Sequence, residues 1–244
     1  MNQQSVLLLQ SRPENDVSDN EFEAICRVGG VAPERVVRLR MDRDELGEID
    51  LDDYAAVIMG GGPANFAYPD EKKLPEQKRY EVWLINLMRE IIKEDKPFLG
   101  LCLGVGAVAM AQGMKPSFDY GEITDMVEVV VNDAGKHDPL LDGLGETFTA
   151  LSGHKEGIGE VPAGCVELAR SDKCVHMIRA GQNVYATQFH PELDLPGFAL
   201  RVEAYRDHGY FAPEEGDEIL AQAAQWDFTK SAKVLQNFVK RYVQ

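Results

Sequence analysis

The chain has 244 residues and a mass of 27.1 kDa, which fits one large α/β domain or one domain with a modest extension. Hydrophobic residues make up 44% of the sequence, an ordinary share for a folded chain that excludes a disordered or low-complexity protein. The 41 acidic and 25 basic residues give a net charge of −16, whereas a nucleic-acid binder needs a basic face. We therefore expect small-molecule or protein partners, with no nucleic acid and no membrane.

The first half of the chain alternates runs that predict strands with runs that predict helices. Strands are predicted at residues 6–10, 35–39, 55–59 and 96–100. Helices are predicted from Ser18 or Asp19 to about Val28, from 76 to 93, and from 105 to 111. Strands and helices that alternate at this spacing favour a parallel sheet with crossover helices.

The second half is predicted to be rich in strands and to end in helices. The strands fall at residues 126–131, 147–151, 165–169, 175–179 and 184–189, and the helices at 196–208, 214–225 and 229–242. We expect residues 1–208 to form one domain and residues 209–244 to form a helical extension packed on it. The extension carries Trp226, Phe228, Phe238 and Tyr242. These aromatics are expected to be buried against the domain; the alternative is a homodimer or partner interface.

The sequence contains no recognisable export signal or membrane span. The apolar run at residues 6–9 is far shorter than the core of a signal peptide, and no stretch approaches the ~18 apolar residues of a membrane span. The four cysteines, Cys26, Cys102, Cys165 and Cys174, form no C-x-x-C pair and have no zinc-finger spacing with histidine. These features predict a cytoplasmic protein whose thiols are reduced.

Cys102 lies in the run G-L-C-L-G at residues 100–104, between a predicted buried strand and a helix of small residues. Flanking glycines allow a tight turn that projects one side chain, as at a nucleophile elbow. The positive N-terminal end of the following helix favours a thiolate, and the backbone N–H of Leu103 would face an oxyanion. The alternative is a buried structural cysteine beside glycines that packing requires.

A thiol nucleophile needs a base, and the strongest candidate among five histidines is His190. It follows a predicted strand, and Glu192 two residues later can hold one ring nitrogen while the other faces sulfur. His208 is expected to cap a helix end, and His137 and His176 have no evident partner.

The glycine run G-G-G-P at residues 60–63 ends a third apolar strand. It lacks the Lys-Ser/Thr pair of a phosphate loop and opens no G-x-G-x-x-G helix, so nucleotide binding is the weaker interpretation. A rigid turn whose N–H groups approach a reacting carbonyl oxygen is the stronger one.

Three motifs in this order, over about residues 5–205, resemble the class I glutamine amidotransferase family. They are G-G-G-P at 60–63, G-L-C-L-G at 100–104 and Q-F-H-P-E at 188–192. The resemblance is greatest to stand-alone proteins similar to the amidotransferase domain of GMP synthase. It implies a flavodoxin-like, three-layer α/β fold with a mostly parallel central sheet and a Cys-His-Glu triad.

By that resemblance, Cys102 is the nucleophile, His190 the base and acid, and Glu192 the orienting carboxylate. Gly62 and Leu103 would supply the two N–H groups of the oxyanion hole. The implied reaction is attack on the side-chain amide of glutamine, release of ammonia and hydrolysis of a γ-glutamyl thioester. It requires no metal and no organic cofactor.

Two positions depart from the family pattern. The family continues the elbow as G-x-C-x-G-x-Q, whereas this sequence has Gly106 in place of the glutamine. The family's Ser-His-x-Asp run reads here as Gly153, His154, Lys155 and Glu156. The candidate substrate-binding positions are Gly61, Gly106, Gly153 and His154. Because two of these positions depart from the family pattern, a substrate other than free glutamine is an alternative to glutamine itself.

The leading hypothesis is a thiol hydrolase that cleaves a γ-glutamyl amide, either glutamine or a related γ-glutamyl compound. Released ammonia would be passed to a separate synthetase subunit, because the sequence has no Ser-Gly-Gly-x-Asp-Ser pyrophosphatase loop. The alternative is an inactive or partner-dependent regulatory protein on the same fold.

Overall fold

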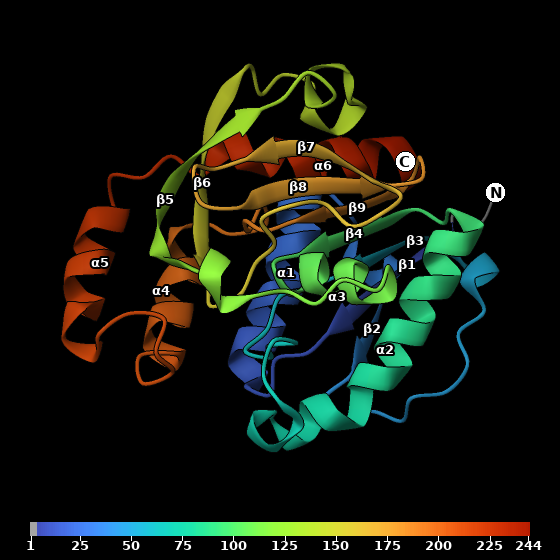
Figure 1. Ribbon diagram of the computed structural model, residues 1–244, viewed down its shortest axis with the longest axis horizontal. Helices are drawn as coiled ribbons and strands as arrows, with labels where there is room; N and C mark the ends of the chain where they lie inside the picture. The colour runs from blue at the N-terminus through green and yellow to red at the C-terminus, as the bar shows by residue number, and fades with distance from the viewer. Residues whose placement is uncertain (1–3) are drawn as a thin grey trace.

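A computed structural model describes residues 4–244 and contains one nine-stranded sheet, in the order β2-β1-β3-β4-β9-β8-β7-β5-β6 (Figure 1). The strands are β1 (Ser5–Gln10), β2 (Val36–Arg40), β3 (Tyr54–Met59), β4 (Phe98–Leu101), β5 (Glu122–Val131), β6 (Thr147–His154), β7 (Cys165–Arg170), β8 (Val175–Ala180) and β9 (Val184–Thr187). The helices are α1 (Asn15–Gly29), α2 (Pro75–Glu94), α3 (Leu103–Ala111), α4 (Leu195–Ala204), α5 (Gly216–Ala223) and α6 (Thr229–Tyr242).

Half of the sheet is parallel and half antiparallel. Strands β2, β1, β3, β4 and β9 pair in parallel, and β9, β8, β7, β5 and β6 pair antiparallel. Strands β1, β3, β4 and β9 read as nearly continuous apolar runs because helices bury both of their faces, whereas the edge strand β2 carries Arg38 and Arg40. Their carboxyl ends, where β4 and β9 stop, carry the segments that contain Cys102 and His190.

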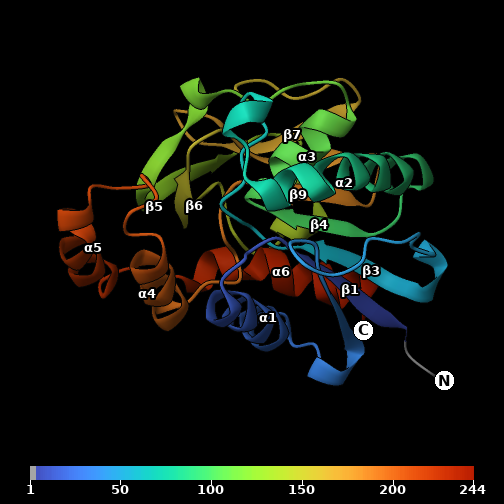
Figure 2. The ribbon, with the colours of Figure 1, turned by 90° about the horizontal axis from the view of Figure 1, so that it is seen from below.

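Helices cover the sheet on both faces, which gives three layers (Figure 2). One face packs against α1 and α6, and the other against α2 and α3, so each face has its own hydrophobic core. The predicted α/β, flavodoxin-like fold is confirmed, with the strand-rich second half forming the antiparallel part of the same sheet.

The predicted ends of two helices were wrong. Helix α1 begins at Asn15, not at Ser18 or Asp19, because Glu14 is its N-cap and Asp16 lies in its first turn. Helix α4 ends at Ala204, not at residue 208, and the chain then turns through Gly209, whose φ of 75° is unfavourable for other residues.

The C-terminal helices pack on the sheet layers. Val234, Leu235, Phe238 and Val239 of α6 are fully buried in the core that α1 also contributes to. The ring of Trp226, which precedes α6, lies 5.2 Å from the ring of Phe198 in α4. Phe238 is therefore buried within one chain, whereas Trp226, Phe228 and Tyr242 are only half-buried. The division of the chain at residue 208 stays a prediction.

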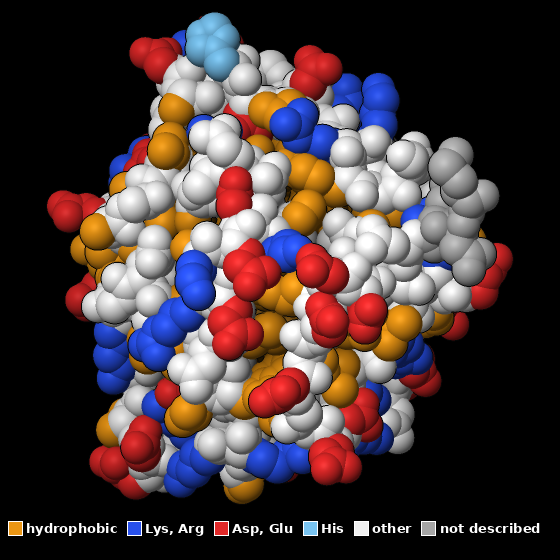
Figure 3. Space-filling model, turned by 90° about the vertical axis from the view of Figure 1, so that its right-hand side faces the viewer, with side chains coloured by type: hydrophobic (Ala, Val, Ile, Leu, Met, Phe, Trp, Pro, Cys, Tyr) orange, Lys and Arg blue, Asp and Glu red, His pale blue; other side chains and the backbone are white. Residues whose placement is uncertain are grey.

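The surface carries the acidic excess of the composition. The face in Figure 3 shows Asp and Glu side chains gathered across its middle, with Lys and Arg mainly towards its edges. Within residues 4–244, no helix combines the length and the apolar character that crossing a bilayer requires.

Candidate active site

Cys102 stands at the turn between β4 and α3, in a strained backbone conformation. Its φ of 52° and ψ of −85° are rare for a residue other than glycine, and strain of this kind is concentrated at functional sites. The turn is held by a 2.7 Å hydrogen bond from the Cys102 N–H to the carbonyl of Thr187, at the end of β9. The side-chain amide of Gln188 donates to the sulfur at 3.7 Å. The predicted elbow is therefore present, and the adjacent strand fixes it.

His190 and Glu192 form a buried pair beside this thiol. Nδ1 of His190 lies 2.8 Å from Oε1 of Glu192, which is completely buried. Burial alone lowers the pKa of His190, but the Glu192 carboxylate and the Cys102 side chain outweigh it and raise the pKa to about 9. Burial opposes ionisation of Glu192 too, yet the His190 charge and hydrogen bond hold its pKa at about 2. The ring is thus kept cationic, with its second nitrogen free to face sulfur.

The glycines at 60–62 are required by close approaches. A Cβ on Gly60 would collide with the carboxylate of Glu21, and a Cβ on Gly61 would lie 2.8 Å from Cε1 of His190. At Gly62, a Cβ would collide with the Ser11 hydroxyl, which donates to the Gly61 carbonyl at 3.1 Å. The turn can therefore lie against the imidazole only because it has no side chains.

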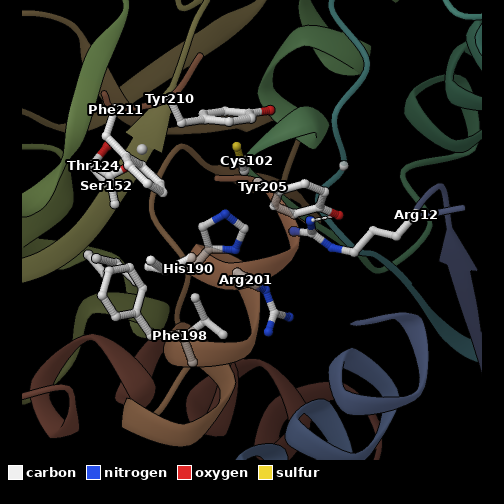
Figure 4. A pocket seen from close by; sticks show the side chains of 15 residues that line it. Arg12, Cys102, Thr124, Ser152, His190, Phe198, Arg201, Tyr205, Tyr210 and Phe211 are labelled. Atoms are coloured by element: carbon white, nitrogen blue, oxygen red, sulfur yellow. Dashed lines mark hydrogen bonds between the residues drawn. The ribbon is translucent and has the colours of Figure 1, made fainter. Parts of the chain in front are cut away.

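Two small cavities meet at Cys102. The first has a volume of about 60 Å³ and is bordered by Cys102, His190, Gly62 and Gly153. The second, of about 20 Å³, lies between Cys102 and a set of residues from the loop after β3, from α3 and from the loop after β6. Tyr210 borders both, and Figure 4 shows its ring next to the Cys102 sulfur in this view. The phenol therefore borders the place where the two cavities meet.

The structure brings together every residue that the sequence singled out for the site. Gly62 and Leu103, the predicted oxyanion donors, border the second cavity together with Cys102. Gly61 lies where an added Cβ would collide with the His190 ring, and Gly153 borders the first cavity. His154 borders the second cavity, but its ring nitrogens are held by Glu122 and by the carbonyl of Glu156.

Gly106 has a structural explanation. A Cβ there would lie 2.7 Å from the fully buried ring of Phe66, and 3.4 Å from Oε1 of Glu156. Glu156 in turn accepts hydrogen bonds from the backbone N–H groups of Phe66 (2.9 Å) and Ala67 (2.6 Å). Phe66, fixed by Glu156, thus occupies the space into which a side chain at position 106 would project.

We expect Gly106→Ala to destabilise the protein by about 1–3 kcal/mol, because the methyl group overpacks the Phe66 ring. The matched control is Gly104→Ala in the same helix, where a Cβ meets no atom within 4 Å. That change should instead stabilise the protein by about 0.5–1 kcal/mol through helix propensity. Urea unfolding of the two variants measures both effects, and equal stabilities would contradict this account of Gly106.

Sequence reasoning missed a buried polar layer beneath the site. Arg12 forms a 2.9 Å ion pair with Glu21 and donates at 2.9 Å to the Tyr205 hydroxyl, the bond drawn in Figure 4. Nη2 of Arg201 lies 3.8 Å from Oε1 of Glu192 and has no hydrogen-bond partner among the described residues. Both arginines border the first cavity. No motif marks these residues, since they come from the loop after β1 and from α4.

The fold and this grouping define an α/β protein with a cysteine at a strand–helix elbow and a buried His–Glu pair beside it. Comparison with known proteins then places the chain: it matches the family described as glutamine amidotransferase class-I over residues 16–201. The chain belongs to the class I glutamine amidotransferase family.

Two similar curated relatives are glutamine-hydrolyzing components of GMP synthase. The one from Methanopyrus kandleri is 38% identical over 142 residues, which cover 57% of this chain and 67% of the relative. The protein of the same name from Methanosarcina acetivorans is 34% identical over 125 residues, which cover 49% of this chain and 60% of the relative. The matched part of the chain thus spans only about 60–67% of these relatives.

Solved structures extend the fold match to nearly the whole chain. A glutamine amidotransferase of Thermotoga maritima matches with a TM-score of 0.74 and 24% identity over 98% of both chains. A glutamine amidotransferase of Methylobacillus flagellatus matches with a TM-score of 0.73 and 19% identity, over 100% of this chain and 96% of that one. At these identities the matches establish the fold.

Proposed function

We propose that the protein is a thiol hydrolase that cleaves a γ-glutamyl amide through Cys102, His190 and Glu192. The observation that carries the proposal is a strained elbow cysteine that borders one cavity with a buried imidazole, itself held 2.8 Å from a carboxylate. Membership of the class I glutamine amidotransferase family supports an amide substrate. The catalytic roles and the leaving group are proposals.

In the first half-reaction, His190 holds the proton of the thiol and the Cys102 sulfur attacks the amide carbonyl carbon. The tetrahedral oxyanion faces the N–H groups of Gly62 and Leu103, which the glycine loop and the turn before α3 hold in place. His190 then protonates the nitrogen, the C–N bond breaks, and ammonia or an amine leaves. A γ-glutamyl thioester remains on the sulfur.

In the second half-reaction, a water molecule attacks the thioester. His190 removes a proton from that water, the C–S bond breaks, and the γ-carboxylate of glutamate is released with a restored thiol. Glu192 holds the imidazolium in both halves, and the nearby positive charge of Arg201 keeps the carboxylate ionised. All steps use groups of this chain and require no cofactor.

Position 106 carries no side chain, and Phe66 fills the space beside it. This change in the binding region supports a leaving group larger than ammonia or a different placement of the substrate. The family's glutamine side chain at this position is absent, so its contact with free glutamine is lost. If ammonia is released, we propose that a separate synthetase chain accepts it, because the curated relatives are named as components of GMP synthase.

The test is a panel of γ-glutamyl amides of increasing size, starting with free glutamine, with glutamate formation as a common readout. Turnover of at least one member, with glutamate and the corresponding amine in equal amounts, is expected. Absence of turnover across the panel, together with no acylation of Cys102 in mass spectra, would favour a regulatory protein on this fold.

Tyr210 is proposed to gate access to the thiol. It follows Gly209, and the Lys155 ammonium lies 4.8 Å from the centre of its ring and also donates to the carbonyl of His208. Tyr210 borders two outer grooves as well as both inner cavities, so it separates the grooves from the cavities.

Replacing Tyr210 with alanine is expected to raise the rate of Cys102 alkylation by iodoacetamide several-fold, because the ring no longer lies next to the sulfur. Tyr210→Phe keeps the ring and should alkylate at the wild-type rate. Peptide mass spectrometry over a time course measures both rates. Equal rates for the alanine and phenylalanine variants would show that the ring does not restrict access.

A further inference from the structure

Four side chains of three metal-binding kinds converge outside the catalytic grouping. Glu122 begins β5, His154 ends β6, Cys174 precedes β8 and His176 lies within β8. One ligand atom from each lies within 4.8 Å of all the others. Cys174 and His176 are completely buried, and His154 and the Glu122 side chain are exposed by only 4% and 8%. The cluster therefore lies inside the antiparallel half of the sheet.

Glu122 is the centre of the cluster. Its Oε2 lies 3.1 Å from Nε2 of His154 and 2.9 Å from Nε2 of His176, and the Cys174 sulfur lies 3.9 Å from the same His154 nitrogen. Ser171 donates to Oε1 at 2.6 Å, which orients the carboxylate from outside the cluster. Tetrahedral Zn²⁺, with bonds of about 2.0–2.3 Å, separates its ligand atoms by roughly 3.3–3.7 Å. The observed separations bracket that range.

The two neighbours of the His154 ring suit a metal ligand. Nδ1 of His154 lies 2.8 Å from the backbone carbonyl of Glu156, and its Nε2 faces the Glu122 carboxylate. Both neighbours accept hydrogen bonds, whereas a neutral imidazole has a single N–H. A metal ion bound at Nε2 suits this geometry, because Nδ1–H then donates to the Glu156 carbonyl and Nε2 faces the Glu122 carboxylate. A histidine that binds metal through one nitrogen usually donates the other N–H to a carbonyl or carboxylate, as Nδ1 is placed to do here.

We propose that Glu122, His154, Cys174 and His176 form a binding site for a divalent metal ion of the zinc class. A metal would bring the Cys174 sulfur, both imidazole nitrogens and the Glu122 carboxylate into one shell, and these four atoms all lie within 4.8 Å of one another. The combination of one thiolate, two imidazoles and one carboxylate suits Zn²⁺ rather than Mg²⁺ or Ca²⁺. This assignment departs from the sequence-based expectation of no metal, which rested on the family resemblance and on the absence of zinc-finger spacing.

Four protein ligands fill a tetrahedral shell, so the site is structural and has no open position for a substrate. The metal would join β5, β6 and the start of β8. Ser152 and Gly153, which border the first cavity beside Cys102, directly precede the ligand His154 in β6. Glu122 and His154 also border an open groove with Tyr68, which gives an ion a path to the ligands.

The test uses the full chain carrying Cys102→Ala, so that the active-site thiol cannot bind the ion. After chelator treatment and desalting, ZnCl2 is added and bound zinc is measured by elemental mass spectrometry together with the melting temperature. One zinc per chain and a higher melting temperature are expected, with no such shift from MgCl2. Co²⁺ in place of zinc should give a thiolate charge-transfer absorption.

His176→Gln in the same background removes one ligand while keeping an N–H donor that can face Glu122, so the protein should fold. We expect it to bind zinc more than about tenfold more weakly, and Cys174→Ser to lose the Co²⁺ charge-transfer absorption. His137→Gln and Cys165→Ser lie outside the cluster and should bind as the parent does. No zinc retention by the parent, or equal retention by parent and His176→Gln, would overturn the proposal in favour of a purely hydrogen-bonded cluster around Glu122. These readouts do not depend on hydrolase activity.

Discussion

Replacing Cys102 with alanine is expected to lower γ-glutamyl amide hydrolysis by at least about a thousandfold, the loss typical when the nucleophile of a triad is removed. The alanine has no sulfur to form the thioester, and no described side chain in either cavity is placed to replace it. Steady-state glutamate formation, compared with wild type, measures the loss. An unchanged melting temperature would exclude unfolding as its cause.

Two other cysteines provide the control for this prediction. Burial raises the pKa of Cys26 to about 11, and it also raises the pKa of the half-buried Cys165. These thiols are therefore protonated at neutral pH, so Cys102 should react first with iodoacetamide. Cys165→Ala should retain wild-type turnover. Full activity of Cys102→Ala would reject the thioester mechanism.

The residues of the site were predicted from the sequence more accurately than the ends of individual helices. Gly60–Gly62, Cys102 and the pair His190–Glu192 were predictable because each follows a buried parallel strand, and such strands end at one edge of the sheet. The family resemblance of the three motifs grouped them, and this rule explains why the fold brings them to one edge. Helix ends such as that of α4 were less predictable, since they depend on single capping and turn contacts.

Residues that act through long-range contacts gave no comparable signal. Arg12 and Arg201 are 189 positions apart in the sequence. Arginine is usually exposed to solvent, yet both of these side chains are buried beside the His–Glu pair. His176 showed no partner in the sequence because Glu122 lies 54 residues earlier. Antiparallel pairing of β5, β7 and β8 brings them together, and register of this kind is not encoded in a local pattern.

Replacing Glu192 with glutamine is expected to move the alkaline limit of activity from about pH 9 to below neutral pH. In the wild type the carboxylate raises the pKa of His190 to about 9, so the imidazolium that protonates the leaving group persists up to that pH. Without the negative charge, burial dominates and lowers the pKa of His190. At pH 8 the variant should lose about a hundredfold to ten-thousandfold in kcat/KM, as for other triads that lose their carboxylate.

The same pair predicts an effect on stability whose sign can be worked out. Because the pKa of His190 is raised in the folded state, its contribution is complete below the unfolded pKa of about 6.5 and is lost as pH rises through about 9. The lowered pKa of Glu192 gives a contribution present above about pH 4.3 and lost as pH falls towards about 2. The stability advantage of wild type over Glu192→Gln should therefore be greatest between about pH 4.5 and 6.5 and shrink towards pH 9.

Melting temperatures across this pH range measure the stability advantage, with Glu203→Gln on the exposed face of α4 as the matched control. Parallel curves for wild type and Glu192→Gln, with the same alkaline limit of activity, would mean that Glu192 does not set the charge of His190.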